Sequence, residues 1–139
     1  LSKFLNAISL EETDSKISEI IGVNLNTSNI GYTHNNGKAF SIDIEIYLCE
    51  SLNNGNVSIQ ILNNHDIPII HSWIFKEDST LLNKQGKHQL KCIFPNLRLY
   101  QGDYYCKVIL AANNGNSVIQ ILDNIWSFDV VMYEIEIAY

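Results

Sequence analysis

The sequence is poor in positive charge. Its 139 residues include nine lysines and arginines against fifteen aspartates and glutamates, and Arg98 is the single arginine. Proteins that bind nucleic acid usually gather many basic side chains on one surface to contact phosphates. With a formal net charge of −6, the chain is not expected to bind nucleic acid.

Long apolar runs are also missing. No run reaches the roughly 18 residues of a membrane-spanning helix, and no secretory signal pattern opens the chain. The first residue is Leu1 rather than methionine, so we expect a piece of a longer protein. A chain of this length suits one domain that buries a core of its own.

The sequence contains few cysteines, and their spacing shows no pairs. The three cysteines, Cys49, Cys92 and Cys106, are an odd number without a Cys-x-x-Cys spacing. An odd set of distant cysteines indicates neither a disulfide framework nor a zinc site. We expect reduced thiols in a cytosolic protein.

Catalytic patterns are absent as well. The four histidines lack His-x-His or His-Glu-x-x-His spacing, and neither a Gly-x-Ser-x-Gly motif nor a phosphate-binding glycine loop occurs. Asp43 and Glu45 share one face of an expected strand and could serve as a glycosidase pair. A solvated acidic face explains them better, because exposed strand positions must be polar. The sequence therefore predicts no catalytic residues, no metal and no cofactor.

Asparagine, in contrast, is abundant and punctuates the chain. There are seventeen asparagines but only two prolines. They cluster at 35–37, 53–56, 63–64 and 113–116, and Asn-Gly pairs supply the positive φ angles of tight turns. Residues 53–62 (NNGNVSIQIL) and 113–122 (NNGNSVIQIL) nearly repeat, which we interpret as two hairpins with the same turn chemistry.

Between these turns, apolar residues alternate with polar ones. Residues 40–48 show the clearest case, with Phe40, Ile42, Ile44 and Ile46 on one side and Asp43 among those on the other. Further strands are expected at 57–61, 69–75, 88–94, 104–111, 118–122, 126–131 and 132–139. Seven to eight short strands without a long helix predict an all-β fold, an antiparallel immunoglobulin-like or jelly-roll β-sandwich over 17–139. Residues 1–16 read as a linker.

A disulfide-linked immunoglobulin domain is an alternative. Tyr104 precedes Cys106 by two residues, as in the tyrosine corner of those domains, and Trp73 lies between Cys49 and Cys106. The alternation argues against the disulfide: if Phe40 points inward, Cys49 points outward and cannot meet an inward Cys106.

Aromatic side chains suggest sugar binding. Tryptophan and tyrosine rings stack on sugars, while neighbouring polar groups bind hydroxyls. By alternation, Tyr104 and Trp126 belong to the core. The candidate carbohydrate-binding residues are placed together on one outward sheet face: Tyr47, His71, Trp73, Lys91 and Tyr105.

One segment carries a family resemblance. Residues 94–104 (FPNLRLYQGDY) lead into an alternating strand, which residues 121–130 (ILDNIWSFDV) follow. These motifs resemble the C-terminal carbohydrate-binding domain of Wzt, the ATP-binding subunit of bacterial O-antigen polysaccharide ABC transporters. They are scaffold motifs, so the resemblance transfers no sugar-contacting residue.

The resemblance implies a function and partners. It implies a non-catalytic, cytoplasmic β-sandwich at the inner face of the inner membrane, which binds the non-reducing end of a lipid-linked O-polysaccharide for export. A preceding ATPase domain, joined through residues 1–16, would connect it to the membrane subunit of the transporter. An immunoglobulin-like adhesion or structural module without a sugar ligand is the alternative.

The C-terminal residues suggest an interface. Residues 132–139 alternate apolar with acidic side chains up to the last position, and an uncovered apolar strand would invite aggregation. The family resemblance implies a homodimer that exchanges this strand. Pairing of residues 132–139 with the sheet of their own chain is the alternative.

Overall fold

A computed structural model describes residues 16–74 and 82–132 of the chain, and this part contains strands and no helix. Eight strands follow one another: β1 (Glu19–Asn26), β2 (Thr33–Asn35), β3 (Phe40–Leu48), β4 (Asn56–Asn63), β5 (Pro68–Ile74), β6 (Gly86–Phe94), β7 (Gly102–Ala112) and β8 (Ser117–Val131). The predicted all-β class is confirmed, but β1 and β2 are not among the strands that the sequence predicted. The expected strand at 132–139 and the linker at 1–16 lie, except for Met132 and Lys16, outside the described residues.

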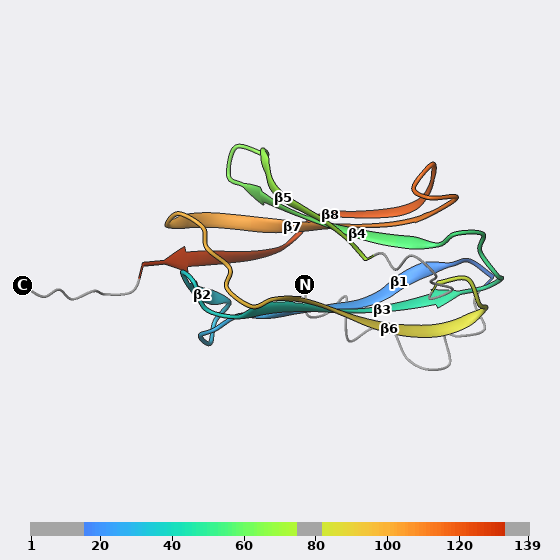
Figure 1. Cartoon of the computed structure of the whole chain (residues 1–139), viewed down its shortest axis with the longest axis horizontal. Helices are drawn as coiled ribbons and strands as arrows, with labels where there is room; N and C mark the ends of the chain where they lie inside the picture. The colour runs from blue at the N-terminus through green and yellow to red at the C-terminus, as the bar shows by residue number, and fades with distance from the viewer. Residues whose placement is uncertain (1–15, 75–81, 133–139) are drawn as a thin grey trace, which may run out of the picture.

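The strands form two layers, as the sandwich prediction requires (Figure 1). A three-stranded sheet has the order β1-β3-β6, and a five-stranded sheet has the order β2-β8-β7-β4-β5. Two facing sheets bury one side of each strand, which is why apolar and polar residues alternate along β3 and β7.

One pairing departs from the antiparallel prediction. All pairings of the described strands are antiparallel except that of β2 with β8, which is parallel. Strand β2 is only three residues long, and Thr33 to Asn35 lie opposite Asp129 to Val131. So short a segment lacks the periodicity that would have made it visible in the sequence, and its direction depends on tertiary contacts.

The core lies between the sheets. Phe40, Ile42, Ile44 and Ile46 of β3 are at most 1% exposed, as their alternation predicts. The ring of Phe40 packs 4.8 Å from that of Phe128, centroid to centroid, across the sandwich. Burial of apolar area on this scale is the main stabilising contribution to such a fold.

The last described strand is longer than predicted. The sequence suggested separate strands at 118–122 and 126–131, because Asp123 and Asn124 disfavour strands. The structure instead continues β8 from Ser117 to Val131, paired with β7 along most of its length through two irregularities. The ladder with β7 outweighs the low strand propensity of two residues.

The repeated NNGN segments are not both hairpins. Residues 113–116 do connect β7 to β8, but residues 53–55 belong to the connection from β3 in one sheet to β4 in the other, and Asn56 begins β4. The two segments contact each other, since the amides of Asn113 and Asn114 donate to the carbonyls of Asn53 and Asn54 at 2.8 and 3.2 Å. The two similar segments therefore bond to each other and do not form two equivalent turns.

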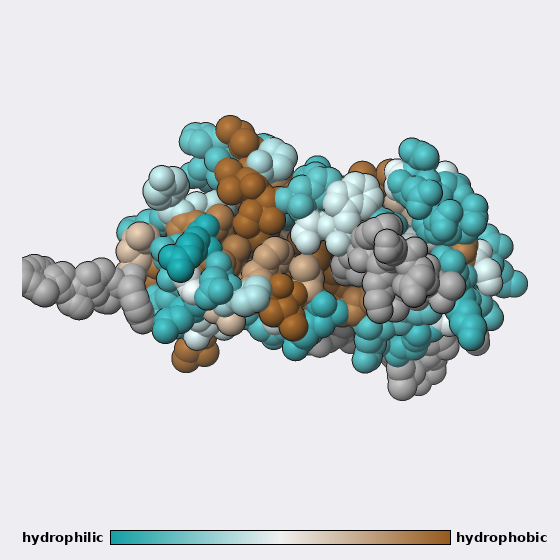
Figure 2. All heavy atoms as spheres, viewed as in Figure 1, coloured by the Kyte–Doolittle hydropathy of each residue, from teal (hydrophilic) through white to brown (hydrophobic). Residues whose placement is uncertain are grey.

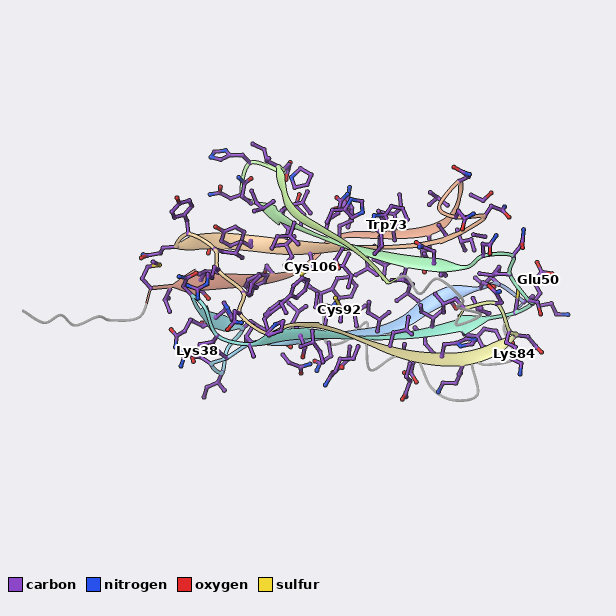
Figure 3. All side chains as sticks on the ribbon, viewed as in Figure 1. Lys38, Glu50, Trp73, Lys84, Cys92 and Cys106 are labelled. Carbon is purple, nitrogen blue, oxygen red and sulfur yellow. The ribbon has the colours of Figure 1, made fainter. Side chains whose placement is uncertain are left out.

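The cysteines are free thiols. Cys106 is fully buried between the sheets, while Cys49 lies at the end of β3, where its backbone amide and its sulfur contact the Ser18 hydroxyl. Figure 3 shows Cys92 and Cys106 between the layers. No disulfide joins Cys49 to Cys106.

Candidate functional site

The five predicted site residues do not share one face. His71, Trp73 and Tyr105 belong to β5 and β7 of the five-stranded sheet, whereas Tyr47 and Lys91 belong to β3 and β6 of the three-stranded sheet. Outward side chains of the two sheets point to opposite sides of a sandwich. The prediction of one common face is wrong, because alternation assigns a side chain to the outside but does not say of which sheet.

Tyr47 is not available at the surface. The strict alternation of β3 ends at Ile46, and Ile46, Tyr47 and Leu48 are 0%, 7% and 0% exposed. The end of β3 is therefore covered on both faces. The expectation that Tyr47 is an outward, accessible ring is wrong for this reason.

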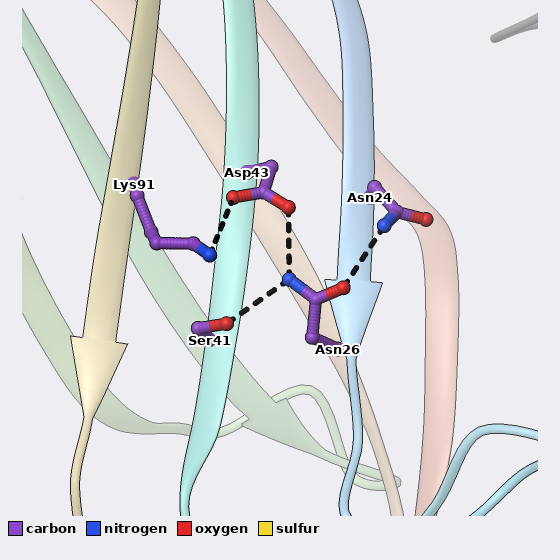
Figure 4. Close-up of polar contacts among 5 residues, drawn as sticks. All are labelled: Asn24, Asn26, Ser41, Asp43 and Lys91. Carbon is purple, nitrogen blue, oxygen red and sulfur yellow. Dashed lines mark hydrogen bonds and ion pairs between the residues drawn. The ribbon is translucent and has the colours of Figure 1, made fainter.

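Lys91 lies in a polar network on the outer face of the three-stranded sheet (Figure 4). Its ammonium group is 3.5 Å from a carboxylate oxygen of Asp43. The side-chain amide of Asn26 donates to the other Asp43 oxygen at 2.9 Å and to the Ser41 hydroxyl at 3.0 Å, and Asn24 donates to Asn26. The partners of Lys91 are thus supplied by its own sheet.

Glu45 is engaged in the same way. Its carboxylate is 3.2 Å from the Lys87 ammonium group and accepts a hydrogen bond from the Gln89 amide at 3.2 Å. Asp43 and Glu45 therefore each have a lysine partner. This arrangement fits a solvated polar face better than a pair of catalytic carboxyl groups.

The outer face of the five-stranded sheet carries an aromatic pair. The rings of His71 and Trp73 stack with centroids 5.3 Å apart and an interplanar angle of 28°. Trp73 is 48% exposed and points away from the core (Figure 3). A Cβ on Gly115, in the turn between β7 and β8, would lie 3.0 Å from the indole, so the ring reaches across β4 toward that turn.

Apolar side chains continue this surface. Ser58 is opposite Trp73 on β4, Ile109 follows opposite Ser58 on β7, and Ile121 follows opposite Ile109 on β8. Ile121 is 50% exposed. We call Trp73, Ile109 and Ile121, together with His71, the aromatic strip.

Tyr105 lies on the same outer face, two residues before Lys107 on β7. Lys107 is opposite Gln60 of β4, which is opposite His71 of β5. Its hydroxyl donates to a carboxylate oxygen of Asp66 at 2.5 Å. This hydrogen bond, together with desolvation and the negative charges of Asp66 and Asp123, raises the pKa of Tyr105 to about 12. The phenol is therefore neutral and oriented at physiological pH.

Sequence reasoning missed a hollow at one end of the sandwich. It has a volume of about 680 Å³, within the range of small-molecule sites. The turn after β4, the segment before β7 and the end of β8 surround it, and its polar lining includes Asn36, Asn64, Arg98, Tyr100, Gln101 and Asp103. The alternation of Leu97, Arg98, Leu99 and Tyr100 was the available signal, but it lies in a connection rather than a strand.

No group of three or more potential metal ligands occurs among residues 16–74 and 82–132. Within those ranges, no helix is long and apolar enough to cross a membrane. Exposed isoleucines include Ile67, Ile69 and Ile93, and Figure 2 shows hydrophobic surface in a band across the molecule, left of its middle.

Comparison with known families decides the assignment. The sequence model of the Wzt C-terminal domain family matches residues 11–137, which is most of the chain. The chain belongs to this family. No curated protein matches the sequence.

Solved structures agree with the Wzt C-terminal domain fold. The crystal structure of the C-terminal domain of Wzt superimposes with a TM-score of 0.71 and 11% sequence identity, covering 86% of this chain and 77% of that chain. A Niemann-Pick type C2 protein from the Japanese carpenter ant gives a TM-score of 0.54 at 10% identity, over 86% of this chain and 95% of that one. At such identities the likeness shows a shared fold.

Proposed function

We propose that this domain recognises the non-reducing end of a lipid-linked O-antigen polysaccharide for export by an ABC transporter. The observation that carries the proposal is the family match over residues 11–137. The domain would select the glycan, and the ATP-binding and membrane subunits would move it. In this role the domain works at the cytoplasmic face of the inner membrane.

The aromatic strip supports a sugar ligand. Sugar rings present an apolar face of C–H groups to an aromatic ring while their hydroxyls bind polar groups beside it. The Trp73 indole is half-exposed, and its stacking on His71 holds it in position. A ring fixed before binding loses little conformational entropy when the ligand arrives.

Hydrogen-bonding groups accompany the strip. In the register of the sheet, His71 lies opposite Gln60 on β4, and Gln60 lies opposite Lys107 on β7. Lys107 is 3.8 Å from a carboxylate oxygen of Asp123. Amide, ammonium and carboxylate groups next to an indole form the mixed surface that carbohydrate recognition needs. We therefore propose His71, Trp73 and Tyr105 as ligand contacts.

The domain is proposed to bind without catalysis. The two carboxylates that share a strand face, Asp43 and Glu45, are both engaged by lysines on the outer face opposite to Trp73. The phenol of Tyr105 has a raised pKa and stays neutral, so it can donate a hydrogen bond to a ligand without taking part in a reaction.

We further propose that the domain forms a homodimer through residues 132–139. Strand β2 pairs with β8 only at residues 129–131, so residues 117–122 of β8 have no strand partner on that edge among the described residues. An open edge of this kind accepts an added strand. Two sites in one transporter would raise the effective concentration of a weakly bound glycan.

The test of glycan recognition is a pair of single substitutions. Trp73→Ala and Tyr105→Ala should each weaken binding to the O-polysaccharide of the source organism at least tenfold, about 1.4 kcal/mol. Lys91→Ala on the opposite outer face is the control and should leave the affinity unchanged. Calorimetric titration and a thermal melt of each variant separate lost contacts from lost folding.

The opposite result would move the site. If Lys91→Ala weakened binding while Trp73→Ala and Tyr105→Ala did not, the ligand would contact the three-stranded sheet. If the wild-type domain bound no polysaccharide, an interaction module without a sugar ligand would replace the proposed function.

A further inference from the structure

The segment before β7 alternates although it is not a strand. Leu97 and Leu99 are 3% and 7% exposed and point into the core, so Arg98 and Tyr100 between and after them point outward. In an extended chain, residues two apart lie on the same side, about 6–7 Å from each other. Arg98 and Tyr100 therefore stand together on one wall of the hollow, and Tyr100 is 85% exposed.

Hydrogen bonds hold this segment on both sides. The Leu97 amide donates to the Lys38 carbonyl at 2.9 Å, the Leu97 carbonyl accepts from the Gly37 amide at 2.7 Å, and its oxygen is 3.0 Å from Nε2 of buried His34. The Leu99 amide donates to the Asn36 side chain at 2.7 Å.

The C-terminal side of the segment is fixed as well. The Tyr104 hydroxyl donates to the Tyr100 carbonyl at 2.7 Å, and the Tyr104 ring stacks on Phe128 in the core. This contact is a tyrosine corner of the kind known from immunoglobulin-like sandwiches. The backbone that presents Arg98 is thus rigid before any ligand binds, which lowers the entropic cost of binding.

Arg98 has a different environment from three of the lysines. Lys87, Lys91 and Lys107 are each within 4 Å of a carboxylate on their own sheet, at 3.2, 3.5 and 3.8 Å. Arg98 forms no ion pair with any carboxylate among residues 16–74 and 82–132. A guanidinium group binds carboxylate or phosphate through two parallel hydrogen bonds.

We propose that the hollow beside Arg98 binds an acidic sugar unit through that unit's oxyanion, a carboxylate or a phosphate. The inference rests on the proposed function, because it adds a charged subsite to a glycan-binding surface. Arg98 holds the anion, and the exposed ring of Tyr100 offers an apolar face to the sugar. The amides of Asn64 and Gln101 line the same hollow and reach hydroxyls.

Charge and position support one anionic unit at this place. A domain of net charge −6 has no bulk attraction for anions, so recognition must come from a local cation. Asp103 also lines the hollow and disfavours a second negative charge next to the first. Ile69 of β5 lines it too, two residues before His71, so the hollow adjoins the aromatic strip.

Nitrogen-15 NMR titration of the ¹⁵N-labelled domain tests the inference. The probes are methyl β-D-glucuronide, glucose 6-phosphate and the neutral methyl β-D-glucoside. We expect an acidic probe to shift the amides of residues 63–64 and 98–103 and to bind at least tenfold more tightly than the glucoside. The tighter of the two acidic probes identifies carboxylate or phosphate as the preferred oxyanion.

Two variants complete the experiment. Arg98→Gln should weaken binding of the acidic probe at least tenfold and leave the affinity for the glucoside unchanged. Lys84→Gln removes the same charge at the other end of β6. It should leave the affinities for the acidic probe and for the glucoside unchanged. Both side chains are exposed, so both variants should fold, and their thermal melts verify this.

Equal binding of acidic and neutral probes, or an Arg98→Gln variant that binds the acidic probes like wild type, would overturn the inference while leaving glycan recognition intact. The absence of any shift at the hollow would overturn it as well. The proposed function fails separately, if the wild-type domain does not bind the polysaccharide and Trp73→Ala changes nothing.

Discussion

Gly55 lies where the chain passes from the three-stranded to the five-stranded sheet, close to the backbone of Leu82. A Cβ at this position would be 2.3 Å from the Leu82 carbonyl oxygen and 2.9 Å from its Cβ. Leu82 is 1% exposed and cannot move outward without opening the core. Glycine is therefore required here for close approach.

Gly55→Ala should consequently lower the free energy of unfolding by about 1–3 kcal/mol, the usual cost of an overpacked buried position. Gly22→Ala is the matched control, because its Cβ would meet nothing closer than 3.7 Å and should change stability little. Urea denaturation measures both. Equal stability of the two variants would show that the backbone at Leu82 can shift without lowering the free energy of unfolding.

Tyr105 provides a pH-dependent contact. Its hydrogen bond to Asp66 raises the pKa from the ordinary 10 to about 12. Because the folded protein holds this proton more tightly than the unfolded chain does, the stabilising contribution is complete below pH 10. It is lost as the pH rises toward 12.

Carbon-13 NMR of the tyrosine rings should therefore show Tyr105 titrating near pH 12. Asp66→Asn removes the acceptor charge and should return the pKa toward 10, while the positive φ of 63° at this position remains acceptable to asparagine. A Tyr105 pKa that stays high in Asp66→Asn would assign the shift to desolvation or to Asp123 instead.

The two sheets are held together without a disulfide. Cys106 of β7 points into the core, and the backbone amide of Cys49, at the end of β3, bonds to Ser18. Packing of the β3 and β7 side chains supplies the contact between layers. Burial also raises the pKa of the Cys106 thiol to about 12, which keeps it protonated and unreactive.

Reductant should therefore leave the melting temperature unchanged within about 2 °C, since loss of a disulfide would cost roughly 2–5 kcal/mol. Thermal melts monitored by circular dichroism, with and without dithiothreitol, make the comparison. A large drop in the melting temperature would reveal a disulfide in the protein and restore the immunoglobulin interpretation.

The proposed dimer would use one edge of the five-stranded sheet. Over residues 117–122, β8 lacks a strand partner opposite β7 in the described part of the chain. Residues 132–139 follow directly and keep the alternation of a strand. Exchange of this segment between two chains would extend the sheets of both protomers.

Deletion of residues 132–139 should therefore convert a dimer into a monomer, or into aggregate, in sedimentation velocity experiments at micromolar concentration. Truncation of residues 1–10 is the control and should leave the dimer intact. An intact chain that already sediments as a monomer would contradict strand exchange and favour pairing of residues 132–139 within their own chain.

The sequence by itself determined the class of fold. Alternation along 40–48 and 104–111 identified β3 and β7, because a sandwich buries every second side chain. The same rule placed Tyr104 and Trp126 in the core, where they are 8% and 2% exposed. The motifs at 94–131 indicated the family that comparison then showed.

The tertiary structure alone decided which outward residues are neighbours. Alternation has a period of two and carries no information on which sheet a strand joins, so Lys91 and Trp73 were grouped although they lie on opposite faces. Alternation places Tyr47 at the surface, because the sequence does not show what covers the end of β3. The burial of Tyr47 depends on that tertiary contact.

The hollow beside Arg98 depends on the same kind of information. It brings together the turn after β4, the segment before β7 and the end of β8, which are far apart in the chain. Local sequence specifies each of these pieces. Only the packing of two sheets, driven by burial of their shared core, places the pieces around one space.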